Sequence, residues 1–175
     1  SYGELDKLSL QLAAWLQSLG LEPGARVAIM LPNVPQFAVS MAAVLRAGFT
    51  CVNVNPLYTA RELEHQLKDS GATAIIILEN FAHTLAQVLD KTAIRHICLT
   101  SMGDLLGGLY GSWITFAVRH LAKMVPAFDL PLGQATASGG EARRVTLFNK
   151  ALNAGASLKL TPSNADLDTI AFLQY

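Results

Sequence analysis

The sequence predicts a doubly wound α/β fold, in which helices flank a largely parallel sheet. The first observation is that short apolar runs such as "VAIML" and "TAIIIL" alternate with segments of helical pattern. Strands that alternate with helices of about 10–15 residues form parallel sheets with right-handed crossovers. The second observation is that these runs carry no charge, which indicates strands that are buried on both faces.

The first expected helix lies in "SYGELDKLSLQLAAWLQSLGL". Ser1 and Glu4 have the spacing of a capping box at the start of a helix. A spacing of three to four residues gives this segment one apolar face, made by Leu5, Leu8, Leu12, Trp15, Leu16 and Leu19. Gly20 supplies a stop signal. "EPGARVAIML" then predicts a turn followed by a buried strand.

Three helix–strand pairs follow. We expect a helix at about residues 34–46, 59–68 and 81–91, each leading to a strand: "TCVNV", "TAIIIL" and "RHICLT". In the middle helix, Thr59 and Glu62 form a second capping box, and Gly71 marks the end. This half of the chain is typical of repeated βα units.

The regular alternation ends at Met102. "GDLLGGLYGSWITFAVRHLAKMVP" predicts a loop and one amphipathic helix, on which Thr115, Arg119 and Lys123 form a narrow polar stripe. Residues 127–142 look irregular, residues 143–155 resemble a short helix, and "TPSNADLDTIAFLQY" ends as a strand. We therefore divide the chain into a βα-repeat subdomain (1–101), a helical and loop insertion (102–165) and a closing strand (166–175).

Composition points to a partly covered surface. Hydrophobic residues make up 51% and charged residues 15% of the chain, whereas a soluble domain has about 25% charged residues. The uncharged stretch from Val27 to Leu45 contains Pro32 and Pro35, which would cost a spanning helix its backbone hydrogen bonds. The stretch from Leu105 to Val118 is too short to span a bilayer. We expect no transmembrane helix.

Charge and cysteine content argue against several further classes of protein. The 13 basic and 13 acidic residues give a net charge of zero, without a basic cluster, so nucleic acid is not an expected partner. Cys51 and Cys98 stand alone in apolar runs and are expected to be buried free thiols. No signal peptide is evident, which predicts a cytoplasmic location. Because the chain begins with Ser1 rather than Met, we expect a cut piece or a processed product.

No complete catalytic site can be read from the residues alone. No Gly-x-Gly-x-x-Gly follows the first strand, no Gly-Lys-Ser/Thr loop occurs, and no Gly-x-Ser-x-Gly elbow is present. "GGLYG" at 107–111 does not follow a strand and indicates a flexible loop. Glu62 and His65 are interpreted as a solvent-facing helical pair, because a di-metal site would need a second copy. We predict neither catalytic nor metal-binding residues.

The apolar segment at 112–125 has two interpretations. It docks onto another part of a larger protein, which we favour, or it lies on a membrane surface with Arg119 and Lys123 at the headgroups. A free-standing flavodoxin-like module that binds a nucleotide or a flavin is a further alternative for the whole chain. All three remain open at this point.

One segment carries a family resemblance: "CVNVNPLYTARELEHQLKDSGATAIII", residues 51–77. It resembles the bacterial long-chain fatty-acid–CoA ligases of the adenylate-forming superfamily. "SYGELDKLS", "GARVAIMLPN", "LRAGF" and "NFAHTL" resemble the same family in the same order. The resemblance covers almost the whole chain and is weakest at 104–165. It implies that the predicted sheet is part of the large N-terminal domain of these enzymes.

The resemblance also implies an activity. The parent enzyme would use ATP and Mg²⁺ to convert a long-chain fatty acid into an acyl-adenylate and pyrophosphate, and coenzyme A would then form acyl-CoA and release AMP. In this family the closing strand leads into a phosphate-binding loop, which Tyr175 opens. Tyr175 is thus the one predicted cofactor-binding residue. The loop at 79–83 lies where relatives approach coenzyme A, but without the arginine that some of them use.

From the same resemblance we expect the chain by itself to be inactive. Its low charge content would leave bare the surfaces that face the rest of the enzyme, so we also expect it to self-associate. Its expected partners are the remainder of the same polypeptide, fatty acid, ATP and coenzyme A. The expected location is the cytoplasm, with contact to the inner face of the membrane through 112–125 as an open alternative.

Overall fold

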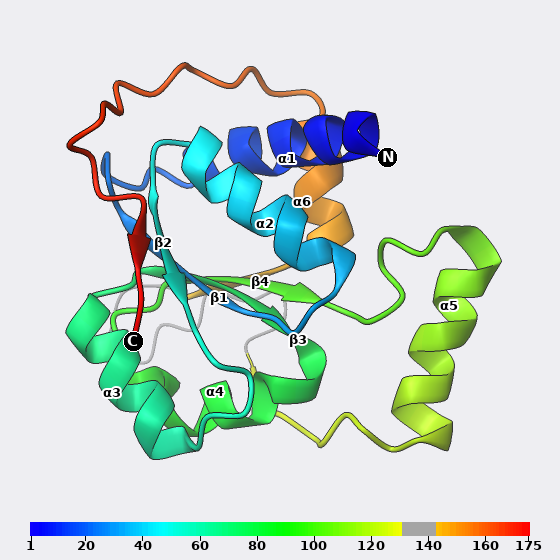
Figure 1. Ribbon diagram of the computed structural model, residues 1–175. Helices are drawn as coiled ribbons and strands as arrows, with labels where there is room; N and C mark the ends of the chain where they lie inside the picture. Colours follow the sequence, from blue (N-terminus) through cyan, green and yellow to red (C-terminus); the bar gives the residue numbers. More distant parts are fainter. Residues whose placement is uncertain (131–142) are drawn as a thin grey trace.

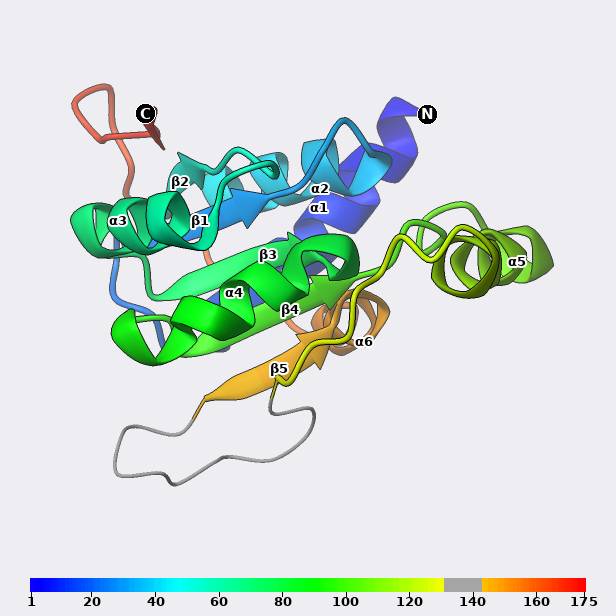
Figure 2. The same ribbon diagram turned by 90° about the horizontal axis from the view of Figure 1, so that it is seen from below.

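The structure is a computed structural model that describes residues 1–130 and 143–175. One parallel sheet lies between two layers of helices (Figures 1 and 2). In space its six strands follow the order β5-β4-β3-β1-β2-β6. The strands are β1 (Arg26–Met30), β2 (Thr50–Asn53), β3 (Ala74–Leu78), β4 (His96–Thr100), β5 (Arg144–Leu147) and β6 (Phe172–Leu173). The predicted α/β class is confirmed.

Helices connect these strands. They are α1 (Tyr2–Gln17), α2 (Pro35–Arg46), α3 (Ala60–Ser70), α4 (Ala82–Val88), α5 (Gly108–Phe116) and α6 (Phe148–Gly155). Short 3₁₀ turns, η1 (Glu79–Phe81) and η2 (Leu89–Lys91), flank α4, so the helix expected at 81–91 is interrupted at both ends. A π-helical turn, η3 (Ala117–Leu121), continues α5.

The predicted start signals are confirmed. Ser1 caps α1 and Thr59 caps α3, and in both cases the third helical residue, Glu4 or Glu62, completes a capping box. At the end of α3, Gly71 takes a left-handed conformation with φ of 61°. Only glycine adopts that conformation without steric cost. Local sequence thus fixes where α3 begins and ends.

Successive side chains of each strand point to opposite faces of the sheet and contribute to two separate apolar layers. Val27, Ile29 and Cys51 point to the layer made with α1, α2 and α6. Ala28 and Met30 point to the opposite layer, made with α3 and α4. This is the period of two that a strand imposes, here with both faces covered. The expected burial of β1 on both faces is confirmed, because residues 27–30 are fully buried.

The helix α6 packs very closely on α1. A Cβ atom placed on Gly155 would lie 1.8 Å from the backbone oxygen of Gln11 and 3.2 Å from the backbone nitrogen of Trp15. The absence of a side chain at Gly155 therefore sets the distance between the two helices. This contact holds α6 over the face of the sheet.

The structure corrects the prediction for residues 143–155. Only Phe148–Gly155 is helical, and Arg144–Leu147 forms β5, which pairs in parallel with β4. Both β5 and α6 fall in the range that we assigned to the insertion, yet they extend the common sheet and its core. The segment predicted as irregular, 127–142, lies mostly outside the described residues.

Residues 108–121, comprising α5 and η3, project from the body of the molecule (Figures 1 and 2). We call these residues the arm. Within the described ranges, none of the helices has the length and apolar character that crossing a bilayer requires.

Candidate functional site at the carboxyl edge of the sheet

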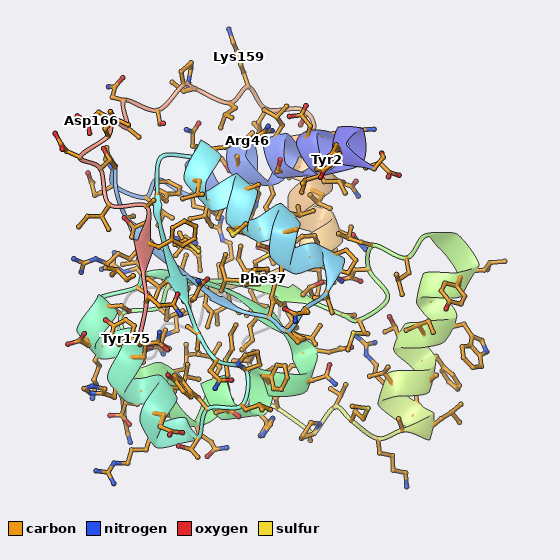
Figure 3. All side chains as sticks on the ribbon, viewed as in Figure 1. Tyr2, Phe37, Arg46, Lys159, Asp166 and Tyr175 are labelled. Carbon is orange, nitrogen blue, oxygen red and sulfur yellow. The ribbon has the colours of Figure 1, made fainter. Side chains whose placement is uncertain are left out.

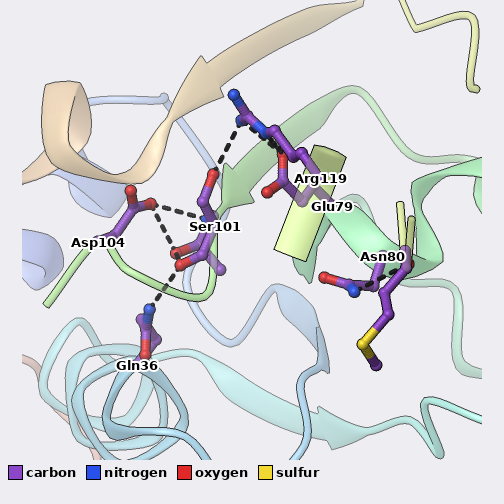
Figure 4. Close-up of polar contacts among 8 residues, drawn as sticks. Gln36, Glu79, Asn80, Ser101, Asp104 and Arg119 are labelled. Atoms are coloured by element: carbon purple, nitrogen blue, oxygen red, sulfur yellow. Dashed lines mark hydrogen bonds and ion pairs between the residues drawn. The ribbon is translucent and has the colours of Figure 1, made fainter. Parts of the chain in front are cut away.

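The carboxyl ends of parallel strands meet at one edge of a sheet, where ligands bind in doubly wound folds. The chain continues from β3 into Glu79 and Asn80, and from β4 into Ser101. Gln36 in the first turn of α2 reaches the same edge. Figure 4 shows these side chains together with Asp104 and Arg119.

Glu79 is the central group of this edge. Its side chain is 2% exposed, and its Oε2 atom accepts hydrogen bonds from Nε and Nη2 of Arg119 at 2.9 and 2.6 Å. The hydrogen bond from Arg119 to this carboxylate raises the pKa of the guanidinium. A buried carboxylate needs such a partner, since an unpaired buried charge is very costly. The Oε1 atom of Glu79 has no hydrogen-bond partner.

Ser101 connects three parts of the chain. Its hydroxyl accepts from Nη2 of Arg119 at 3.1 Å, and its carbonyl oxygen accepts from Nε2 of Gln36 at 2.9 Å. Asp104 accepts from the backbone nitrogen of Ser101 at 2.8 Å and from the Thr100 hydroxyl at 2.9 Å. The turn after β4 is therefore held by α2 and by the arm.

Asn80 forms a second contact, with the chain just after the arm. Its Nδ2 atom donates to the carbonyl oxygen of Met124 at 2.9 Å, and its own carbonyl oxygen lies 3.2 Å from Nδ1 of His83 (Figure 4 shows the former contact). In the loop at 79–83, which the resemblance places where relatives approach coenzyme A, Glu79 and Asn80 are thus engaged by contacts within the chain. Nothing in the structure assigns a ligand to this loop.

A cavity of about 510 Å³ lies between the arm and the carboxyl ends of β4 and β5. Its lining includes Ser101, Asp104, Arg119 and Lys150. Asp104 already accepts two hydrogen bonds, and the side chain of Arg119 is paired with Glu79. Asp104 and Arg119 are therefore already engaged with neighbouring groups and are not set up as a nucleophile and its base.

Tyr175, the predicted cofactor-binding residue, lies just beyond β6 and beside α3 (Figure 3). Its hydroxyl donates to Oδ2 of Asp69 at 2.6 Å, and this hydrogen bond raises the pKa of the phenol. The side chain is half exposed. The structure does not bring Tyr175 into the group formed by Glu79 and Arg119, and its role toward ATP stays a prediction.

The other candidates stay apart. His65 is exposed on α3, and the carboxylate of Glu62 serves the cap of that helix. Among the residues that the structure describes, no three His, Cys, Asp or Glu side chains are placed to share a metal ion. Cys51 and Cys98 are buried free thiols, as predicted.

Sequence reasoning missed the pair of Glu79 and Arg119. The available signal was the acidic residue that directly follows the fully buried strand β3, because a carboxylate at that place needs a cation. Its partner is 40 residues away, and no local pattern identifies it. The segment "GGLYG", predicted as a loop, instead forms the first turn of α5 from Gly108 onward.

The whole chain, residues 1–175, matches the family described as AMP-binding enzyme. It is 44% identical over 176 aligned residues to the long-chain-fatty-acid–CoA ligase of Escherichia coli O157:H7, covering 100% of this chain and 29% of that protein. The corresponding ligase of Yersinia pestis is 45% identical over 177 residues, again with 29% of its length covered. The chain thus spans less than a third of the curated relatives that it matches.

Solved structures agree on the fold. A long-chain-fatty-acid-CoA ligase from Archaeoglobus fulgidus superposes with a TM-score of 0.67 at 20% identity, over 100% of this chain and 27% of that one. The A domain of a carboxylic acid reductase from Segniliparus rugosus, in complex with AMP and a carboxylic acid, gives a TM-score of 0.73 at 17% identity, over 99% and 26%. At these identities the likeness establishes the fold alone. With the family match over all residues, the chain belongs to the AMP-binding enzymes.

Proposed function

We propose that the chain is the amino-terminal part of a long-chain fatty-acid–CoA ligase. The observation that supports this proposal is the identity of 44% along the entire chain with a bacterial ligase of that name. The whole enzyme would join a fatty acid to AMP, with release of pyrophosphate, and then transfer the acyl group to coenzyme A. The phosphoanhydride is needed because a carboxylate becomes a good electrophile only when its oxygen is made a good leaving group.

In this proposal the chain supplies a framework and not the reacting groups. The sheet positions the end of the closing strand, where Tyr175 would adjoin the phosphates of ATP. ATP and Mg²⁺ chemistry requires cations and amide donors around the triphosphate. Because the chain spans 29% of the ligase that it matches, we expect it to be inactive alone, and we assign no metal ligand to it.

The remaining parts of the proposal concern location and assembly. We place the protein in the cytoplasm, with peripheral contact to the membrane through residues 112–125 and with self-association of the isolated chain. The low charge content supports a surface that another part of the enzyme, or a bilayer, covers. The alternative of a free-standing flavodoxin-like module is not adopted, because the whole chain matches AMP-binding enzymes.

The test is an activity measurement on the product of the complete reading frame that contains this chain. With oleate, ATP, Mg²⁺ and coenzyme A, we expect oleoyl-CoA and AMP in equal amounts, and no product when any one component is omitted. The 175-residue chain should show no exchange between ATP and pyrophosphate. Failure of the complete product with every fatty acid, despite turnover of another carboxylic acid, would refute the proposed substrate. Turnover by the isolated chain would refute the proposed division of labour.

A further inference from the structure

The arm turns its polar stripe toward the protein. A Cβ atom on Gly103 would lie 1.9 Å from the carbonyl oxygen of Gly111 and 2.6 Å from Oγ1 of Thr115, so this face of α5 lies directly against the chain after β4. One turn further on, Arg119 reaches the buried Glu79. Thr115 and Arg119, two of the three residues of the predicted stripe, therefore face the sheet edge. In this structure the partner of the Arg119 guanidinium is the Glu79 carboxylate, so we do not assign Arg119 to lipid headgroups.

The large apolar side chains of the arm are consequently exposed, although Phe116 also lines the cavity between the arm and the sheet. Leu109 is 91% exposed and Leu121 is 67% exposed. Four more large apolar residues in or next to the arm are also exposed: Tyr110, Trp113, Phe116 and Met124. Single exposed apolar side chains are ordinary, but a group of them on a projecting helix is typical of a surface that binds a protein or a membrane.

The chemistry of this surface fits an anionic bilayer. Between Leu105 and Phe128 there is no acidic residue, whereas Lys123 and His120 are exposed. Tyr and Trp prefer the boundary between headgroups and acyl chains, where Tyr110 and Trp113 would keep their polar groups wet. Lys123 follows the arm and has a long side chain that can place its charge at the headgroups. The arm is too short to span and can lie only in the plane of the interface.

We propose that the arm inserts Leu109, Tyr110, Trp113 and Phe116 into the surface of an anionic membrane. Lys123 contacts the headgroups, while Arg119 remains on Glu79 and holds the arm in this orientation. This inference rests on the membrane contact that we proposed above and deepens it in two respects. It moves the contact toward the amino-terminal end of the arm, and it makes apolar insertion the main interaction.

The chain contains its own reporter for the test. It has two tryptophans, of which Trp15 is 6% exposed and Trp113 is 59% exposed. In a Trp15→Phe variant, fluorescence reports on Trp113 alone. With vesicles of phosphatidylcholine and phosphatidylglycerol, we expect a blue shift of the emission and strong quenching by acyl chains brominated near the headgroup. Raising the salt concentration should weaken binding only a few-fold, because one exposed lysine contributes to the electrostatic attraction.

Sedimentation with the same vesicles locates the contact. Leu109→Glu and Phe116→Glu should each weaken partitioning at least tenfold, equivalent to about 1.4 kcal/mol. The matched control is Leu57→Glu, because Leu57 is 82% exposed but lies outside the arm; it should sediment as the parent chain does. Circular dichroism of each variant shows whether the chain is folded.

The outcomes separate the two levels of the proposal. If the parent chain does not bind vesicles, both the membrane contact and the inserted arm are wrong. If it binds, but Leu109→Glu and Phe116→Glu bind equally well, the membrane contact stands and the arm is overturned as its site. If these variants abolish a dimer seen by sedimentation velocity while vesicles are not bound, the arm contacts a second copy and the proposal is overturned. Since these assays contain no ATP or coenzyme A, they do not depend on the ligase activity.

Discussion

Nη2 of Arg119 lies 2.6 Å from Oε2 of Glu79, a carboxylate that is 2% exposed at the end of β3. The two residues come from the arm and from the sheet. A third atom, the Ser101 hydroxyl, accepts from the same nitrogen. This contact fixes the orientation of the arm relative to the carboxyl edge of the sheet. A substitution at Glu79 should therefore change the position or the mobility of residues 108–121.

Arg119→Ala should be clearly destabilising. It leaves the Glu79 carboxylate buried without a cation, and breaking a buried pair in this way costs about 3–5 kcal/mol. Because Arg119 is 45% exposed, water can partly replace it, and we expect roughly 2 kcal/mol in urea unfolding. Hydrogen exchange of the arm should accelerate in the same variant.

The matched control is Arg46→Ala. Arg46 pairs with Asp6 between two helices, but the Asp6 side chain is 58% exposed, so the loss should be below about 1 kcal/mol. The double variant Glu79→Gln, Arg119→Gln should recover part of the stability, since no buried charge remains. Equal losses for Arg119→Ala and Arg46→Ala would contradict the importance of the buried pair.

Gly155→Ala tests the close packing of α6 on α1. The new methyl group would meet the Gln11 oxygen at 1.8 Å, and the backbones must separate, at a cost of about 1–3 kcal/mol. Gly3→Ala is the control. Gly3 lies in α1, and a Cβ atom at this position would meet no other atom within 4 Å. Alanine is the better helix former by roughly 1 kcal/mol, so Gly3→Ala should leave thermal unfolding unchanged or raise its midpoint. A stabilising Gly155→Ala would show that the helices are farther apart than described.

The βα repeats of the first hundred residues could be predicted because each signal is local. Thr59, Glu62 and Gly71 define α3 within 13 residues of sequence, and the run at 74–78 is buried on both faces. The strand β5 could not be predicted in this way. It contains two apolar residues, Val145 and Leu147, and it exists because β4 offers its backbone: the Arg144 nitrogen donates to the Arg95 oxygen at 2.8 Å. The segment therefore forms a strand because it pairs with β4, and not because of its own sequence pattern.

The candidate edge shows the same limit. The alternation of strands and helices predicts that β3 and β4 end at this edge. It does not predict which side chains meet there. Arg119 and Lys123 occupy the same predicted stripe, and yet Arg119 turns onto Glu79 while Lys123 lies beyond the arm with φ of 50°. The π-helical turn η3 contains Arg119. A pattern based on a regular helix therefore predicts the polar face but not its orientation.

The two cysteines should be inert in the folded chain. Burial raises the pKa of the Cys51 thiol to about 11 and raises that of Cys98 further. Because the thiolate is the reactive form, neither residue should react with a disulfide reagent at pH 8 within the time in which urea-unfolded chain reacts completely. If the native chain rapidly reacted with one equivalent of the disulfide reagent, β2 or β4, which carry Cys51 and Cys98, would have to open readily.

Tyr175→Phe and Asp69→Asn test whether the end of the chain is held as described. The hydrogen bond to Asp69 raises the pKa of the Tyr175 phenol, so Asp69→Asn should move one of the four tyrosines to an earlier point in an alkaline ultraviolet titration. That tyrosine should be absent from the titration of Tyr175→Phe. If Asp69→Asn leaves the titration unchanged, Tyr175 does not lie against α3 in solution.

His96 should make the folded chain less stable in mild acid. Burial, followed by the charges of Arg144 and Arg95, lowers the pKa of its imidazole below the ordinary value of 6.5. The unfolded chain therefore takes up a proton as the pH falls through about 6.5, before the folded chain does, and the free energy of unfolding must decrease there. Above that pH the imidazole is neutral in both states and contributes no such dependence.

The comparison of His96→Gln with the parent chain isolates this effect. Urea unfolding between pH 7.5 and 5 should show the parent chain losing stability relative to His96→Gln as the pH falls, because glutamine has no proton to bind. His65→Gln is the matched control, since His65 is exposed on α3; its stability should follow that of the parent chain. If the difference between His96→Gln and the parent chain stays constant across this range, the two arginines and the burial do not act on His96 as the structure indicates.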